Sequence, residues 1–574
     1  MSESSVLPKR PKRSFLPEQF TISTWDQLKP YFETLLDRPL SSVQTLQQWL
    51  RDRSELESVI SEDLGWRYIR MTCYTDNEEY SKSYQDFIEN IQPAISPYSD
   101  LLNKKLIRSE FLNELKEEAG FKILIRNLKK DIELFREENI PLFTEISTET
   151  QKYAQISGAM TVDVNGKELT LQQAGVILQS TDRSKREEVY HKIAARRLKD
   201  RETLDELFTR LIDLRHKVAL NAGLPNFRDY MFKAYGRFDY TPQDCFKFHE
   251  AIAEEVVPIL NELNQDRKAR LKVSALRPWD KAVDPESREP LKAFENGKDL
   301  TEKSIECFRR LDPFLGQCLS IMREMGHLDL ESRKGKAPGG YNYPLAEIGV
   351  PFIFMNATST MRDMTTIMHE GGHAVHNFLT KDLPLSEFKS PPMEVAELAS
   401  MSMELISMDE WGIFFTKEED LKRAKREQLE DIIETLPWVA TIDQFQHWLY
   451  EHPDHTPAER TTHWNQVFHR FADTVTDWSG LELNRDYQWQ KQLHLYEVPF
   501  YYIEYGMAQL GAIALWRNYK RNKSKGLQGY TNALKLGNLA TIPEIYQAAD
   551  IRFDFSKTYI HELMNFVREE LGKI

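Results

Sequence analysis

The strongest constraint in this sequence is the stretch His369-Glu-Gly-Gly-His373, which carries the spacing His-Glu-x-x-His. On an α-helix, residues four apart lie about 40° apart around the axis and about 6 Å apart along it. Two imidazoles placed in this way can both reach one zinc ion at about 2.0–2.1 Å. Glu370 points about 100° away, where it misses the metal and reaches a metal-bound water. Thr360 and Asp363 have the spacing of a capping box, which predicts that this helix begins near residue 360.

Two glycines lie inside this predicted helix, where each costs about 1 kcal/mol relative to alanine. Gly371 and Gly372 therefore indicate close packing or the close approach of a backbone. We expect the helix to lie directly beneath a strand that carries substrate. Because the motif can also arise by chance, a zinc site requires a third ligand from elsewhere in the chain.

The segment after this helix offers three acidic candidates for the third ligand. Ser390, followed by two prolines, predicts the start of a new helix that carries Glu394, Glu397 and Glu404. Glu397 and Glu404 lie within about 20° of each other around such a helix, and Glu394 is about 60° off that line. We prefer Glu397 as the ligand. Glu404 or Glu394 would then form a hydrogen bond to a ligand histidine without touching the metal. Spacing alone leaves Glu394 open as the ligand.

A third histidine is the rival ligand. His376 lies on the same helix as His369, seven residues further on and about 10 Å along the axis, which is too far to share a tetrahedral ion. The extended motif with a last histidine six residues after His373 is absent, because that position is Leu379. We interpret His376 as a packing residue.

The bulk properties exclude several classes of protein. The chain has 574 residues, of which 41% are hydrophobic and 29% charged, and these values are typical of a globular protein. Its net charge of −14 argues against a nucleic-acid partner. No apolar run approaches the ~20 residues that a membrane span requires, so we expect no membrane partner. Four cysteines without a CxxC pair indicate reduced, mostly buried thiols and a cytoplasmic protein.

The rest of the chain predicts helices with two β signals. Amphipathic helical patterns fill residues 23 to about 140, and residues 160–171 form a hairpin around a type I′ turn at Asn165-Gly166. A glycine-rich loop with Gly339, Gly340 and Tyr341 leads into the β-prone run 348–356, and we expect it to cover substrate. An edge strand here can bind an extended peptide. We divide the chain into an amino-terminal helical region, 1–195, and a zinc catalytic region, 196–574, which together form one two-lobed body.

Several motifs together resemble one known family. The chain resembles the zinc oligopeptidases of the thimet oligopeptidase and oligoendopeptidase F family, and looks most like the bacterial oligoendopeptidase F and Pz-peptidase branch. The resemblance extends from about residue 150 to the carboxyl terminus. It rests on the loop 333–341, the run Phe352 to Asn356, His369 to His373, Glu397-Leu-Ala-Ser, and His494-Leu-Tyr-Glu-Val-Pro-Phe-Tyr501-Tyr502-Ile-Glu-Tyr505-Gly.

The resemblance implies a fold and further site residues. It implies a mainly helical, elongated fold of two lobes around a deep substrate channel, with a small β-sheet beside the active-site helix and zinc at the channel floor. It assigns the third ligand to Glu397 and a supporting acid to Glu404. It also places His494, Tyr502 and Tyr505 beside the scissile carbonyl; without the resemblance, the tyrosines would be read as helix packing.

The sequence therefore predicts a zinc metalloendopeptidase with one Zn²⁺ that hydrolyses short unfolded peptides. Glu370 is the expected base that activates the zinc-bound water, and Tyr502 or Tyr505, with His494, is the expected oxyanion donor. The main alternative is a zinc carboxypeptidase or dipeptidyl carboxypeptidase, which needs a cation to bind the substrate's terminal carboxylate. A peptide binder with a structural zinc is a third reading, disfavoured because a closed site needs no base such as Glu370. The sequence leaves the oligomeric state open.

Overall fold

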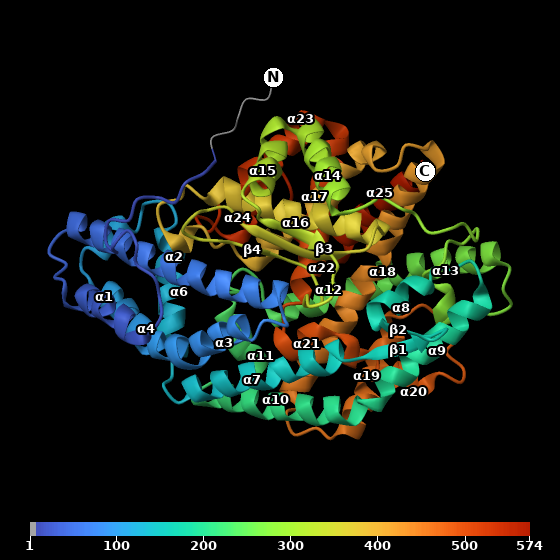
Figure 1. Cartoon of the computed structure of the whole chain (residues 1–574), viewed down its shortest axis with the longest axis horizontal. Helices are drawn as coiled ribbons and strands as arrows, with labels where there is room; N and C mark the ends of the chain where they lie inside the picture. The colour runs from blue at the N-terminus through green and yellow to red at the C-terminus, as the bar shows by residue number, and fades with distance from the viewer. Residues whose placement is uncertain (1–6) are drawn as a thin grey trace.

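The structure is a computed structural model that describes residues 7–574 of the chain, and helices dominate it (Figure 1). The first helices are α1 Trp25–Asp37, α2 Val43–Cys73, α3 Glu78–Asp86, η1 Phe87–Ile91, α4 Gln92–Arg108, α5 Leu112–Leu115, α6 Phe121–Leu134 and α7 Asn139–Gly158. After a hairpin of β1 Thr161–Val164 and β2 Lys167–Thr170 come α8 Leu171–Ile177, α9 Arg183–Lys199, α10 Arg201–Asn221, α11 Phe227–Ala234, α12 Pro242–Glu255, α13 Val257–Leu271, η2 Pro278–Asp280, α14 Gly297–Leu311 and α15 Pro313–Glu324.

The second half of the chain begins with a small sheet and continues with helices only. The strands are β3 Leu328–Glu331, β4 Tyr341–Tyr343 and β5 Phe352–Ala357. The helices are α16 Met361–Thr380, η3 Ser386–Phe388, α17 Met393–Ser407, η4 Met408–Ile413, α18 Glu418–Glu451, α19 Pro457–Phe471, α20 Glu482–Asp486, η5 Gln488–Lys491, α21 Leu493–Glu497, α22 Ile503–Arg521, α23 Lys523–Leu534, α24 Ile542–Ala548 and α25 Lys557–Leu571. The expected mainly helical fold with a small sheet is confirmed.

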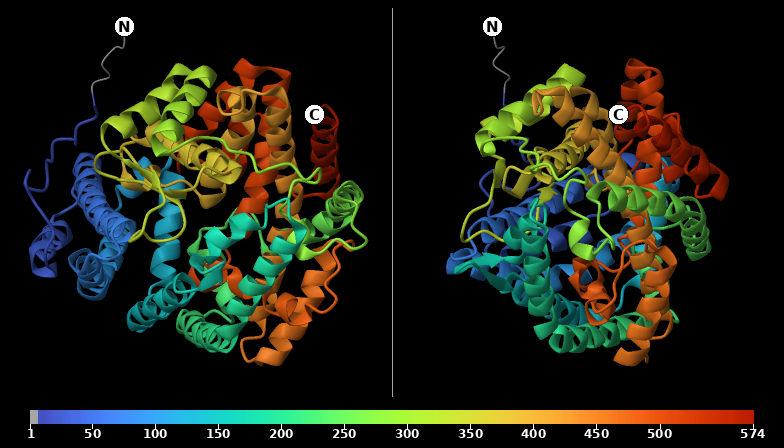
Figure 2. Two further views of the ribbon diagram at one scale, coloured as in Figure 1. Left: turned by 45° about the vertical axis from the view of Figure 1, so that its right-hand side comes forward. Right: turned by 90° about the vertical axis from the view of Figure 1, so that its right-hand side faces the viewer.

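Two large hydrophobic cores lie in different parts of the chain. One lies among α1 to α6, where Leu28, Leu46 and Trp49 are fully buried, and the blue helices of this region lie together at one side of the molecule (Figures 1 and 2). Leu385 and Phe388, from the segment around η3, complete this core. The larger core is built from residues 134–571. The division at residues 195 and 196 stays a prediction.

The hairpin near residue 160 has the turn that the sequence predicts. β1 pairs antiparallel with β2, from Thr161 opposite Thr170 to Val164 opposite Lys167. Asn165 and Gly166 have φ angles of 58° and 76°, as both central residues of a type I′ turn require. Asparagine and glycine accept positive φ at little cost, so this pair fixes the position of the turn. The strands on either side therefore begin and end within a residue of the predicted limits.

The three-stranded sheet positions the helix that carries the metal motif. Its strand order is β3-β5-β4, with β5 parallel to β3 and antiparallel to the edge strand β4. The central position explains why Phe352, Ile353 and Phe354 are all buried. β5 leads directly into α16, whose start is capped as predicted: the amide of Asp363 donates to Thr360 Oγ1 at 3.2 Å, and the amide of Thr360 donates to Asp363 Oδ2 at 2.9 Å.

Three helices form the centre of the larger core. α17 packs against both α16 and α22, and their labels lie together in the middle of the molecule (Figure 1). All four cysteines are buried and unpaired, as expected. Among the described residues, no helix combines the length and apolarity needed to cross a bilayer.

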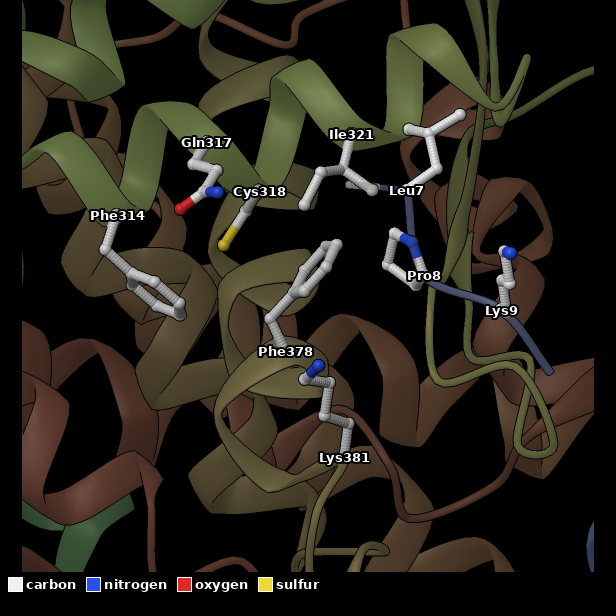
Figure 3. A pocket seen from close by; sticks show the side chains of 9 residues that line it. All are labelled: Leu7, Pro8, Lys9, Phe314, Gln317, Cys318, Ile321, Phe378 and Lys381. Carbon is white, nitrogen blue, oxygen red and sulfur yellow. The ribbon is translucent and has the colours of Figure 1, made fainter. Parts of the chain in front are cut away.

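A pocket of about 490 Å³ lies at the carboxyl-terminal end of α16. Leu7 and Pro8 lie beside Ile321 of α15 and Phe378 of α16 at its rim (Figure 3). The pocket is lined by residues 7–9 and by side chains of α15 and α16, with Lys381 just beyond the end of α16. It contains none of the residues predicted to act in catalysis.

Candidate metal centre and active site

Three of the predicted ligands meet at one point between α16 and α17. Glu397 Oε2 lies 3.4 Å from His369 Nε2 and 3.8 Å from His373 Nε2. One ligand atom from each residue lies within 4.8 Å of the others. Ligands about 2.0–2.1 Å from a tetrahedral zinc ion are about 3.3–3.4 Å apart, so this donor set fits zinc with only small adjustments.

The two glycines of α16 allow its close packing against other helices. A Cβ atom on Gly372 would lie 2.6 Å from Ala399 O of α17, and one on Gly371 would lie 2.5 Å from Phe308 Cζ of α14. The expectation that a substrate-bearing strand lies over these glycines is wrong. Gly371 faces α14 and Gly372 faces α17, and the small size of Gly372 lets α17 bring Glu397 within reach of the histidines.

A second acid from α17 orients one of the histidines. His369 Nδ1 forms a 2.7 Å hydrogen bond with Glu404 Oε1, and Gln428 Nε2 donates to Glu404 Oε2 at 2.8 Å. A proton held on Nδ1 by a carboxylate leaves Nε2 free to bind a metal. Glu404 therefore has the geometry of the predicted supporting acid.

Glu394 lies on the same helix as Glu404 but belongs to a different hydrogen-bond network. Its Oε1 accepts a 2.6 Å hydrogen bond from Tyr240 and lies 4.0 Å from Arg237 Nε. Arg237 also donates to Glu504 Oε1 at 2.7 Å and to the carbonyl of Phe500. Among the described residues no hydrogen bond joins Glu394 to His369, because its different phase on α17 turns it toward the segment between α11 and α12.

Two of the three predicted ligands have the charge state that binds a metal. Burial would lower the pKa of His369, but hydrogen bonds to Glu397 and Glu404 outweigh it and raise that pKa, so His369 must lose a proton when a metal binds. Burial alone would raise the pKa of Glu397, but the hydrogen bond from His369 and the histidine charges outweigh it and hold the pKa at about 2. Burial lowers the pKa of His373 to about 4. An ionised carboxylate and a neutral imidazole are the states in which these groups bind a metal. Burial raises the pKa of Glu370 to about 7, against the charge of His369, so this carboxyl can exchange a proton near neutrality.

The glycine-rich loop approaches α16 through its strand. Asn342 of β4 donates from Nδ2 to the carbonyl of Glu370 at 3.3 Å. Tyr341 stacks on Phe354 with ring centroids 4.8 Å apart, and its hydroxyl lies 2.6 Å from Thr72 Oγ1 of α2. Tyr341 is thus tied to α2, and the sheet lies between that helix and α16.

The two predicted loop glycines have different environments. Gly339 has a φ of +98° and open space where a Cβ would be, whereas a Cβ on Gly340 would lie 3.3 Å from the carbonyl oxygen of Phe354. Gly339 is therefore required by its backbone conformation, and Gly340 by its closeness to β5.

The structure brings the predicted histidine and tyrosines into one cluster. His494 Nε2 lies 3.3 Å from the hydroxyl of Tyr505, and the rings of His494 and Tyr502 are 4.9 Å apart. Burial, and then the charge of Glu397, raises the pKa of Tyr505 well above its usual value; Glu370 adds a smaller effect. Burial raises the pKa of Tyr502 to about 12. Both hydroxyls therefore keep their protons and can donate hydrogen bonds.

The cluster contains one functional contact that sequence reasoning missed. The hydroxyl of Tyr501 donates to Glu397 Oε1 at 2.6 Å, on the carboxylate whose other oxygen faces the histidines. The turn at Phe500, with a φ of 66°, aims Tyr501 at this carboxylate. The amide of Phe500 donates to Gln446 Oε1 at 2.6 Å, and Arg237 binds its carbonyl. The only sequence signal was the adjacent pair Tyr501-Tyr502.

Profiles of two peptidase domains match this chain. The profile of Peptidase family M3 matches residues 176–304 and 316–565, more than half of the chain. The profile of the Peptidase M3 N-terminal domain matches residues 15–135. An oligoendopeptidase F homolog of Borreliella burgdorferi is 24% identical over 529 residues, which cover 86% of this chain and 84% of that protein.

Solved structures have the same fold along almost the whole chain. Pz peptidase A with an inhibitor matches with a TM-score of 0.91 and 26% identity, over 97% of this chain and 99% of that one. An oligoendopeptidase F structure from Bacillus anthracis matches with a TM-score of 0.87 over 97% of both chains, and its 24% identity supports the fold alone. The resemblance to oligoendopeptidase F and Pz peptidase is thus confirmed, and the chain belongs to peptidase family M3, a family of metallopeptidases.

Proposed function

We propose that this peptidase is a zinc-dependent oligoendopeptidase that hydrolyses internal peptide bonds of short, unfolded peptides. The observation that carries the proposal is the convergence of His369, His373 and Glu397 beside Glu370. These three residues would hold the zinc ion, and Glu404 would orient His369. When bound, the ion polarises the scissile carbonyl and lowers the pKa of water near it.

Glu370 moves the protons in the proposed reaction. Its carboxylate accepts a proton from the attacking water and then transfers that proton to the leaving amine. Burial on α16, which raises the pKa of Glu370 to about 7, supports both roles, since the group can bind and release a proton near neutral pH.

The tyrosine cluster stabilises charge on the substrate in this mechanism. Tyr505 keeps its proton and can donate to the oxyanion that forms on the scissile carbonyl, with Tyr502 as the alternative donor. Such a donor is worth about 2.7–4 kcal/mol in other enzymes. His494 lies 3.3 Å from the hydroxyl of Tyr505 and orients it.

The edge strand β4 is the proposed site for the peptide backbone. One side of β4 pairs with β5, and the other side is the edge of the sheet. An extended peptide can pair with such an edge through backbone hydrogen bonds. Asn342 of β4 contacts the carbonyl of Glu370, so a peptide there would run past the catalytic carboxylate. The proposal includes a channel that admits only short, unfolded chains. It also includes a cytoplasmic location, which the four buried, unpaired thiols support.

The experiment is zinc analysis combined with cleavage of an internally quenched peptide blocked at both ends. We expect one zinc ion per chain, cleavage of the blocked peptide, and loss of cleavage after chelation that added zinc restores. A carboxypeptidase or dipeptidyl carboxypeptidase would leave the blocked peptide intact and cut only its unblocked form. That result, or full activity without metal, would overturn the proposal.

A further inference from the structure

Two basic side chains line a cavity that a chain of contacts connects to the tyrosine cluster. The cavity has a volume of about 190 Å³ and lies between the end of α7, helix α9 and the segment 484–491. Arg197 of α9 and Lys491 of η5 both line it. Its other walls are largely apolar and include Leu178, Tyr190 and Ile193. A cavity of this composition suits a small group that carries negative charge next to an apolar part.

Neither cation has a hydrogen-bonding or carboxylate partner within residues 7–574. No side-chain hydrogen bond or ion pair joins Arg197 or Lys491 to any of these residues, whereas Arg196 on the same helix pairs with Asp200. Arg197 is half-buried and burial lowers its pKa, whereas Lys491 is exposed to solvent. An anion between the two side chains would relieve the repulsion between their like charges and offset the desolvation of Arg197.

A chain of contacts connects this cavity to the proposed catalytic residues. Lys491 Nζ lies 4.7 Å from the ring centroid of Trp438, whose Nε1 donates to Gln492 Oε1 at 3.0 Å. Gln492 Nε2 lies 2.7 Å from His494 Nδ1, and His494 contacts Tyr505. Lys491, and with it the cavity, is thus connected to the tyrosine cluster through the η5–α21 segment.

We propose that Arg197 and Lys491 form a subsite that binds a carboxylate of the peptide substrate. The inference rests on the proposed peptidase function and extends it to substrate choice. The carboxylate is either the free carboxyl terminus or an acidic side chain. A guanidinium binds a carboxylate through two parallel hydrogen bonds, and an ammonium adds a compact charge, so the pair is suited to this group. The apolar walls accommodate the carbon atoms next to it.

The test measures peptide binding by calorimetry to the full-length, zinc-loaded Glu370→Gln protein, in which cleavage is blocked. One pair of peptides differs only in a carboxylate or an amide at the carboxyl terminus. A second pair, amidated at that end, differs only in an internal Glu or Gln. We expect the acidic member of one pair to bind at least about tenfold more tightly, since charged hydrogen bonds contribute this much. The pair that shows the difference identifies the source of the carboxylate.

Variants assign the difference to the two cations. Adding Arg197→Gln and Lys491→Gln together should abolish the preference for the acidic peptide. The exposed Lys199, also on α9, provides the control, and Lys199→Gln should keep the preference in full. Lys491→Arg retains the charge and should keep most of it, which excludes general damage to the fold as the cause.

Two results would overturn the subsite. One is equal binding of the acidic and amide members in both pairs; the other is a preference that persists in the double variant. The proposed function is tested separately by wild-type cleavage of the end-blocked peptide. If that peptide is cleaved and no acidic preference exists, only the subsite fails. If no peptide is cleaved, the peptidase mechanism fails, and the binding comparison still decides the subsite.

Discussion

Glu370 is the residue whose side chain the proposed chemistry needs most directly. Replacement by Gln keeps the size of the side chain and removes its ability to accept a proton. We expect Glu370→Gln to retain one zinc ion per chain and to lower kcat about 10²–10⁴-fold, the range for a lost general base. Steady-state cleavage of a quenched peptide and metal analysis measure both quantities. The exposed Glu418, changed to Gln, is the control, and a Glu370→Gln enzyme with wild-type kcat would refute the mechanism.

Tyr501 is expected to hold Glu397 in place for the metal. Tyr501→Phe removes only the hydroxyl that donates to Glu397 Oε1 at 2.6 Å. Loss of such an outer hydrogen bond typically weakens metal binding about 10–100-fold, and we expect a change of this size. Competition with a chelator of known affinity measures it. Tyr502→Phe is the matched control, because among the described residues Tyr502 forms no hydrogen bond with Glu397. Equal zinc affinity in all three proteins would contradict this role.

At the scale of elements, the contact between α16 and α17 depends on Gly372, which has no side chain. Gly372→Ala would place a Cβ 2.6 Å from Ala399 O, and the two helices would have to separate. We expect the free energy of unfolding to fall by about 1–3 kcal/mol and zinc affinity to fall with it, because Glu397 moves with α17. Thermal unfolding and chelator competition measure these effects.

Gly175→Ala in α8 provides the control for that prediction. A Cβ at Gly175 has nothing within 4 Å, so alanine should leave stability unchanged or raise it by about 1 kcal/mol through its helix propensity. If both alanine variants had the same stability, close packing of α16 on α17 would not be the reason for Gly372.

The glycine-rich loop is held to the sheet by a charged cluster that should respond to pH. Burial would raise the pKa of Asp329, but hydrogen bonds from Arg333 and Lys336 outweigh it and hold the pKa at about 2. A carboxyl with a lowered pKa stabilises the fold above its unfolded value of about 3.9, and this contribution disappears as pH falls through about 2.

We therefore expect Asp329→Asn to lower the free energy of unfolding by about 1–3 kcal/mol at pH 7, because its hydrogen bonds are to charged groups. The difference from wild type should shrink as the pH falls from about 4 toward about 2. Denaturant unfolding at pH 7 and pH 3 tests this expectation. A difference that is the same at both pH values would show that the charge of Asp329 contributes nothing.

At the scale of the whole molecule, metal binding should stabilise a fold that already exists without it. The ligands lie on helices of the larger core, and Glu404 and Tyr501 already hold His369 and Glu397. Zinc at about 1,000 times its Kd contributes about 4 kcal/mol. For a chain of 574 residues this corresponds to a rise in Tm of about 3 °C.

Calorimetry with and without chelator measures this shift, and far-UV circular dichroism at 25 °C should be the same in both states. Loss of helix on chelation would show that the metal is needed to form the core. An unchanged Tm would show that the site binds no metal strongly.

The sequence by itself determined the features that depend on neighbouring residues. The spacing of His369 and His373, the capping box at Thr360 and the Asn165-Gly166 turn are all local, because helix periodicity and turn conformation are set within a few residues. Helical phase also favoured Glu397 as the partner of the histidines, since it lies almost in line with Glu404 on one helix.

Only the tertiary structure decided which distant groups meet. Helical phase left Glu394 and Glu404 open as the supporting acid, and the packing of α17 turned Glu404 toward His369 and Glu394 toward Tyr240. Gly372 required a neighbour that no local pattern identifies, and Tyr501 became a partner of Glu397 through a turn at Phe500. These contacts join segments far apart in the chain, so they follow from how the helices pack and not from the pattern of any one segment.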